Sequence, residues 1–308
     1  MSGGPKPIKI LVIVGPTAVG KTNLAVQLAQ SIPSEAISAD SRQIYRGMDI
    51  GTAKPSSEEQ TAVRHHLIDI VEPDQVLSLA EYIRMAKKAI VDINDRGLLP
   101  ILVGGTGQYI RALLEGWTVP EVPPDPALRA ELYAEAALQG AEKLHQRLAA
   151  VDPVAASRID LRNVRRVVRA LEVYLTLGQP ISALQAKKPP NYTPLYLGLT
   201  LPRPLLYQRV DDRIDRMIAH GLVAEVQQLV GQGYGYDLPS MSGLGYQQIG
   251  ASIRGEVSLD EAIILIKRHT RGFVRHQYNW FRLSDPQIHW YNSDELAIEP
   301  LIKLVRSF

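Results

Sequence analysis

The chain has 308 residues and no cysteine, which excludes disulfides, a thiol nucleophile and a thiolate zinc site. Its composition, 45% hydrophobic and 21% charged with a net charge of +2, is ordinary for a soluble globular protein of one large domain or two moderate ones. The N-terminus lacks the apolar region of a secretory signal, and no apolar run approaches the roughly 18 residues of a membrane span, so we expect a cytoplasmic protein without membrane contact.

The predicted elements begin as alternating strands and helices. Residues 8–14, IKILVIV, form a β-branched apolar run that is typical of a strand buried on both faces. The elements expected after it are a helix over residues 21–31, a strand over 35–39, a helix over 79–95 that opens with the capping box of Ser78 and Glu81, and a strand over 98–103. This order predicts a doubly wound parallel sheet.

Two proline-rich segments, residues 120–126 and 187–194, enclose an alanine-rich stretch that we expect to be helical, with helix stops at Gly140 and Gly178. The elements expected after it are a strand over residues 196–201, one long helix over 204–230 and a mostly helical region over 238–283. We predict the α/β class: a P-loop parallel sheet flanked by helices, with an inserted all-helical domain. The expected boundaries are residues 1–120 and 195–308 for the core and 121–194 for the insertion.

The sequence GPTAVGKT, residues 15–22, satisfies the phosphate-loop pattern G-x-x-x-x-G-K-[ST] between a predicted strand and a predicted helix. Backbone N–H groups and the helix N-terminus would hold a diphosphate, with Lys21 as its point charge and the Thr22 hydroxyl as a Mg²⁺ ligand. The usual occupant of such a loop is ATP, and the motif alone does not say which phosphorylated ligand this one holds.

Polar residues follow the next two predicted strands. Asp40 lies where a carboxylate would point into the ligand crevice, as a Mg²⁺ ligand or a general base, although a cap for the following turn is an equal alternative. The loop GGTG, residues 104–107, ends the strand 98–103 and offers the Thr106 hydroxyl at the same edge. By itself this second loop is a weak signal.

Basic residues gather in three places. The helix over residues 205–218 presents Arg209, Arg213 and Arg216, which either pair with Asp211, Asp212 and Asp215 or send one guanidinium to the phosphates. The segment Lys267–Arg282 contains no acidic residue and mixes its cations with aromatic rings, and a second run spans Arg158–Arg169. Such runs suit RNA binding, whereas the alternative for each is a solvated helix face with some rings in the core.

Together these stretches resemble tRNA dimethylallyltransferase, a prenyl transferase that modifies a tRNA adenosine beside the anticodon. The matching blocks run in the family's order through residues 8–290, and the most specific is DSRQIYRGMDIGTAKP, residues 40–55. The remaining blocks are GPTAVGKT, ILVGGTGQYIRALLEG, RRVVRALEVYLTLGQP, SMSGLGYQQI and TRGFVRHQYNWFR. Because the chain has no cysteine for the zinc finger of the eukaryotic branch, it is similar to the bacterial form.

The resemblance implies transfer of a dimethylallyl group from dimethylallyl diphosphate to N6 of adenosine 37, with release of diphosphate and with Mg²⁺ as cofactor. It implies that the catalytic residues are Asp40, as general base, Thr17 and Arg213. The diphosphate-binding residues would be Gly15, Pro16, Thr17, Ala18, Val19, Gly20, Lys21 and Thr22, with Thr22 also on the metal.

The resemblance also implies a tRNA anticodon stem-loop as partner, closed over by the helical insertion, and we expect the protein to be a monomer. The implied tRNA contacts are Asp40, Ser41, Arg42, Gln43, Thr106, Arg129, Arg165, Arg166, Arg169, Gly245, Tyr246, Arg275, His276, Gln277, Trp280 and Arg282.

Three alternatives remain. An adenylate isopentenyltransferase would prenylate free AMP or ATP and would have little use for the insertion or the basic aromatic segment. A small-molecule P-loop kinase would turn over ATP. A nucleic-acid-binding P-loop NTPase should show an apolar strand that ends in aspartate, whereas the candidate at residues 101–105 ends in glycines.

Overall fold

The computed structural model describes residues 6–308, which fall into two compact units: residues 6–114 with 191–308, and residues 115–190. The second unit begins and ends before the expected insertion boundaries of 121 and 194. Its ends are tied to each other, because Trp117 bridges Lys187 and the Lys188 N–H donates to the Gly116 carbonyl at 2.8 Å.

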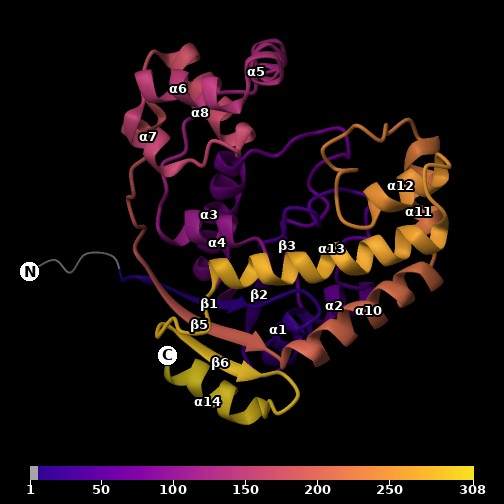
Figure 1. Ribbon diagram of the computed structural model, residues 1–308. Helices are drawn as coiled ribbons and strands as arrows, with labels where there is room; N and C mark the ends of the chain where they lie inside the picture. Colours follow the sequence, from indigo (N-terminus) through magenta and orange to yellow (C-terminus); the bar gives the residue numbers. More distant parts are fainter. Residues whose placement is uncertain (1–5) are drawn as a thin grey trace, which may run out of the picture. The chain divides into compact units, whose positions relative to one another are not determined.

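The first unit is built on a parallel sheet (Figure 1). Its strands within residues 6–308 are β1 (Ile8–Val14), β2 (Ser34–Ser38), β3 (His65–His66), β4 (Leu99–Val103), β5 (Tyr192–Thr200) and β6 (Ile288–Asn292). They pair in the order β3-β2-β4-β1-β5-β6, with Leu11 of β1 in register with Ile101 of β4 and Leu195 of β5. The central strand is fully buried from Ile10 to Val14, as its apolar sequence predicted.

Helices pack on this sheet. Those of the first unit are α1 (Lys21–Ala29), α2 (Ser57–Ala62), α3 (Leu79–Asp95), α4 (Gly107–Leu114), α10 (Arg203–Ala219), α11 (Leu222–Gly231), α12 (Tyr246–Ile253), α13 (Leu259–Trp280) and α14 (Ile298–Ser307). The connections from β1 to β2 and from β3 to β4 run in opposite directions along the sheet, so the right-handed crossovers usual for parallel strands put α1 and α3 on opposite faces. The capping box of Ser78 and Glu81 begins α3 as predicted.

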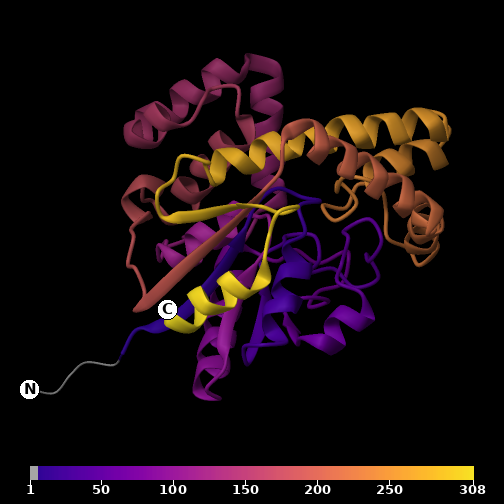
Figure 2. The same cartoon turned by 90° about the horizontal axis from the view of Figure 1, so that it is seen from below.

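The expected single helix over residues 204–230 is wrong. It ends at Ala219 and a new helix, α11, begins at Leu222, because Gly221 adopts a left-handed conformation with φ of 98°. Helix α10 instead runs beside α13, as Figures 1 and 2 both show. Ion pairs between Arg271 and Asp211, and between Lys267 and Asp215, join the two helices, so these two aspartates of α10 face α13.

The second unit consists of helices around a small apolar core of its own. They are α5 (Pro126–Gln139), α6 (Ala141–Val151), α7 (Pro153–Arg158), α8 (Val164–Leu177) and α9 (Ile181–Leu184). Gly140 ends α5 and Gly178 ends α8, which confirms both predicted stops. In neither unit does a helix formed by residues 6–308 have the length and apolar character needed to span a bilayer.

Candidate active site at the carboxyl ends of the strands

The phosphate-loop motif connects β1 to α1. Val14 ends the strand, residues 15–20 form the loop, and Lys21 begins the helix. Gly15 has φ of 140°, and a Cβ at this position would lie 2.4 Å from the carbonyl oxygen of Leu199, so a larger residue does not fit. The close approach to β5 places the loop so that its N–H groups and the α1 N-terminus can meet an anion.

A pocket of about 210 Å³ opens at the ends of β1, β2 and β4. Thr17, Lys21 and Thr22 of the loop line it, together with Asp40 after β2 and Arg213 of α10. The Arg213 guanidinium also donates to the Thr17 hydroxyl at 3.4 Å. The structure thus brings together the three residues predicted to be catalytic and five of the eight predicted to hold the diphosphate, at the edge where parallel sheets bind ligands. These five are Thr17, Ala18, Gly20, Lys21 and Thr22.

Two cationic side chains share this pocket. The Lys21 ammonium group donates to the carbonyl oxygens of Gly15 at 3.0 Å and Pro16 at 2.8 Å. Burial, and next the charge of Arg213, lowers the pKa of Lys21 to about 7, while the carboxylate of Asp40 opposes this effect only in part. Burial also lowers the pKa of Arg213. An anion with several charges would relieve the repulsion between these cations.

Of the three arginines that the sequence singled out in α10, only Arg213 lines the pocket. Arg209 pairs with Asp294 beyond β6, and Arg216 is exposed, whereas Arg213 lines the pocket wall. Helical periodicity alone could not choose among them, because it does not show which face meets the loop after β1.

Asp40 lies in a tight turn directly after β2. Its Oδ1 accepts the Arg42 N–H at 2.8 Å, which is an Asx turn. The Ser41 N–H donates to Thr106 Oγ1 at 3.0 Å, and the Thr106 N–H donates to the Ala39 carbonyl at 3.0 Å. The ends of β2 and β4 are thereby joined, so Asp40 both stabilises a turn and lines the pocket.

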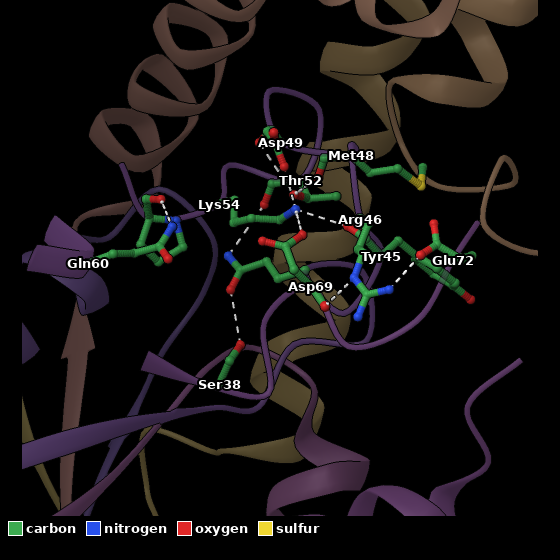
Figure 3. Close-up of polar contacts among 12 residues, drawn as sticks. Ser38, Tyr45, Arg46, Met48, Asp49, Thr52, Lys54, Gln60, Asp69 and Glu72 are labelled. Carbon is green, nitrogen blue, oxygen red and sulfur yellow. Dashed lines mark hydrogen bonds and ion pairs between the residues drawn. The ribbon is translucent and has the colours of Figure 1, made fainter. Parts of the chain in front are cut away.

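The segment that follows Asp40 is held by polar contacts of its own (Figure 3). At its centre Lys54, with 3% of its side chain exposed, donates to the Tyr45 carbonyl at 2.9 Å and pairs with Asp49 and Asp69. Gln43, a predicted tRNA contact, donates its amide N–H into the same segment and also lines the pocket. The block DSRQIYRGMDIGTAKP, residues 40–55, therefore forms one wall of the pocket and is held in place by its own polar contacts.

Two further predicted tRNA contacts bond to other parts of the first unit. Arg42 donates to the carbonyl oxygen of Pro239 at 2.7 Å and to Ser242 Oγ at 3.3 Å. Tyr246 at the start of α12 is 1% exposed, and its hydroxyl donates to Glu225 at 2.6 Å. Arg42 stays partly exposed, whereas Tyr246 and Gly245, which precedes α12, are buried.

The predicted tRNA contacts at the end of α13 divide between two faces. Arg275, His276 and Arg282 are exposed, whereas Trp280 is half-buried and Gln277 is only 5% exposed. The difference follows from helical periodicity, because a helix packed on the protein turns every third or fourth residue inward.

In the second unit the predicted contacts also divide. Arg165 and Arg166 are exposed in the first turn of α8. Arg129 and Arg169 instead bind Glu172, whose side chain is fully buried, through hydrogen bonds of 2.8, 2.9 and 2.6 Å. Two of the four predicted contacts in this unit therefore form ion pairs with a buried carboxylate.

His65 is a pocket residue that the sequence analysis did not select. Its Nδ1 lies 2.8 Å from the Val63 carbonyl oxygen, and its buried Nε2 has no hydrogen-bond partner among the described residues. Burial lowers the pKa of this imidazole. Its neighbour His66 contacts Glu35 instead, so the two histidines point to different surroundings.

Comparisons with known proteins agree with the geometry. A family model described as IPP transferase matches residues 43–284. The tRNA dimethylallyltransferase of Chloroflexus aurantiacus is 59% identical over 274 residues, which cover 89% of this chain and 93% of that protein. The protein of the same name from Dehalococcoides mccartyi is 47% identical over 304 residues, covering 99% and 94% of the two chains.

Solved structures are similar over nearly the whole chain. The full-length tRNA isopentenylpyrophosphate transferase from Bacillus halodurans aligns with a TM-score of 0.71 and 39% identity, covering 97% of this chain and 95% of that one. A eukaryotic dimethylallyltransferase, described as acting on tRNA, aligns with a TM-score of 0.79 and 25% identity, covering 98% and 79%.

Proposed function

This chain belongs to the IPP transferase family, and from that premise we propose that it transfers a dimethylallyl group from dimethylallyl diphosphate to N6 of adenosine 37 in tRNA. The products are N6-(dimethylallyl)adenosine and diphosphate. The observation that carries the proposal is the pocket that the basic side chains of Lys21 and Arg213 share with the carboxylate of Asp40. Lys21 and Arg213 suit the binding of a polyanionic leaving group, and Asp40 suits the role of proton acceptor.

The phosphate loop would hold the donor by its diphosphate. As the C1–O bond breaks, the electron pair moves to the diphosphate, and the growing negative charge meets Lys21, Arg213 and the loop N–H groups. The hydrogen bond from Arg213 to Thr17 Oγ1 fixes the guanidinium against this loop. Because Arg213 and Lys21 repel each other in the free protein, part of the binding free energy comes from relief of that repulsion.

Asp40 would serve the acceptor. An aryl amine such as N6 is a weak nucleophile, so a carboxylate that takes its proton as the C1–N6 bond forms lowers the barrier. The Asx turn to Arg42 and the bond from Ser41 to Thr106 hold Asp40 at the pocket edge without using a flexible loop. The adenine must leave its base stack to reach this pocket, which costs less in an anticodon loop than in a duplex.

Mg²⁺ fits the donor set in the pocket. The Thr22 hydroxyl and the Asp40 carboxylate are hard oxygen ligands, and both line it. Residues 6–308 contain no cluster of three or more histidine, aspartate or glutamate side chains that could hold a metal alone, so diphosphate oxygens would complete the coordination. When bound, the ion would neutralise charge on the leaving diphosphate.

Each unit offers exposed basic side chains for RNA separately. Arg275, His276 and Arg282 are exposed in the first unit, and Arg165 and Arg166 are exposed in the second. Contacts of this kind with phosphates give affinity that falls steeply as the salt concentration rises.

A transfer assay tests the proposal. The full chain is incubated with Mg²⁺, isotope-labelled dimethylallyl diphosphate, unmodified tRNA and an equal concentration of AMP, and the nucleosides are separated by mass spectrometry. We expect the label on adenosine 37 alone. Label on AMP would instead show an adenylate isopentenyltransferase, and unlabelled RNA with RNA-stimulated ATP hydrolysis would show an NTPase.

A further inference from the structure

One buried side chain joins the two loops that line the pocket. Gln277 lies near the end of α13 and is 5% exposed. Its Oε1 accepts the Thr17 N–H at 2.8 Å, and its Nε2 donates to the Gly105 carbonyl oxygen at 3.2 Å. Thr17 belongs to the loop after β1 and Gly105 to the loop after β4, so a single amide links neighbouring strand ends.

The amide of Gln277 lies close against Gly105. A Cβ on Gly105 would lie 2.2 Å from Gln277 Nε2, so the amide occupies the space that the glycine leaves open. One turn later, Trp280 packs on Gly107 so closely that a Cβ there would lie 2.3 Å from the indole ring. Both contacts hold the end of α13 against the loop after β4.

The two linked loops have different tasks under the proposed function, on which this inference rests. The loop after β1 carries Lys21 and would hold the donor. The loop after β4 carries Thr106, whose bond to Ser41 fixes the turn that contains Asp40. We propose that Gln277 is a positioning residue that sets the separation between the donor loop and the turn that serves the acceptor.

The chemistry makes this separation decisive. The donor carbon and N6 react only from a near-attack geometry, about 3 to 3.5 Å apart, and a misplacement of about 1 Å can lower the rate about 100-fold. An amide both accepts and donates a hydrogen bond at one fixed spacing, which suits the Thr17 N–H and the Gly105 carbonyl. Ionised glutamate can only accept, and methionine lacks both functions at a similar length.

The test compares kcat, which depends on the alignment of donor and acceptor, with the Kd values of the two substrates. We expect Gln277→Met to lower kcat about 30- to 100-fold, while the Kd values for dimethylallyl diphosphate and for tRNA change less than about threefold. In Gln277→Glu the carboxyl group can donate to Gly105 only when it is protonated. The ratio of its kcat to that of the wild-type protein should therefore rise as the pH falls.

Gln248→Met is the matched control. Gln248 is also 5% exposed; its Oε1 accepts the Gly245 N–H at 2.9 Å and its Nε2 lies 3.2 Å from His269 Nδ1, away from the two loops. We expect this variant to lower the melting temperature as Gln277→Met does but to keep kcat. Equal kcat losses in the two methionine variants, or a loss seen only in Kd, would overturn the inference while the proposed function stands. No transfer by the wild-type protein would overturn the proposed function itself.

Discussion

Lys21 and Arg213 line the same pocket, where burial of the lysine, and next the charge of Arg213, lowers the pKa of Lys21 to about 7. A phosphate-loop lysine is usually regarded as a permanent cation. Here the ammonium group donates to two carbonyl oxygens of its own loop, and Asp40 only partly offsets the neighbouring charge. The free pocket is therefore poised to take up a proton together with an anion.

The first prediction concerns the pH dependence of donor binding. Below about pH 7 Lys21 is charged both before and after binding, so its contribution to affinity does not change with pH. Above about pH 7 it is neutral in the free protein and must gain a proton, so the affinity should fall by up to about tenfold per pH unit. Calorimetry of dimethylallyl diphosphate binding in two buffers with different ionisation enthalpies measures the proton uptake.

Lys21→Arg is the control for this prediction. Arginine stays charged throughout the pH range used. The variant should bind the donor more weakly than the wild-type protein, and its binding should lack the proton uptake that Lys21 supplies. At pH 8 or above, wild-type binding should take up about one more proton per donor molecule than binding to this variant. Equal proton uptake by the two proteins would contradict the prediction.

Asp40→Asn separates the two roles of this residue. Asparagine can still accept the Arg42 N–H, so the turn and the tRNA affinity should be retained. It cannot accept the N6 proton, so kcat should fall about 100- to 10,000-fold. Single-turnover kinetics and a tRNA binding assay measure the two quantities. Asp212→Asn, at an exposed position of α10, serves as the control. Equal losses of binding and turnover would argue against a general base.

Glu172→Gln should loosen the second unit. Burial raises the pKa of Glu172, but hydrogen bonds from Arg129, the Asp125 N–H and Arg169 outweigh this effect and lower it overall, so the ionised carboxylate stabilises the fold above its unfolded pKa. Loss of that charge leaves Arg129 and Arg169 without their ionic partner at a cost of about 2 to 3 kcal/mol. Amide hydrogen exchange in α5 and α8 should accelerate about 30- to 150-fold.

The exposed pair of Asp160 and Arg162 provides the comparison within the same unit. Asp160→Asn should leave exchange in α5 and α8 unchanged, because solvent screens this ion pair. If both variants exchange at the wild-type rate, the carboxylate of Glu172 does not hold α5 and α8 together.

Local sequence patterns predicted much of this fold. The apolar run before the phosphate loop became the central strand β1, and the capping box of Ser78 and Glu81 began α3. Both signals depend only on residues close in the chain. The strand β3 was missed because two residues carry no periodicity, and β6 because Ile288–Asn292 mixes apolar with polar residues at a sheet edge.

The site itself needed long-range information. The motif identified Lys21 and Thr22, and the resemblance identified Asp40 and Arg213, all of which line the pocket. Neither could show that Gln277, 260 positions from Thr17, turns inward to bind its N–H group. Such pairings depend on how α13 crosses the strand ends, which no local pattern encodes.

The central claim is that the phosphate loop holds a leaving diphosphate rather than a phosphoryl donor. Dimethylallyl diphosphate with heavy oxygen at the bridge between carbon and phosphorus tests it directly, with mass spectrometry of every product after reaction with tRNA. The account predicts that all heavy oxygen leaves in diphosphate, with one diphosphate released for each prenylated adenosine. Heavy oxygen retained in a prenyl alcohol, or phosphate released without modified RNA, would contradict it.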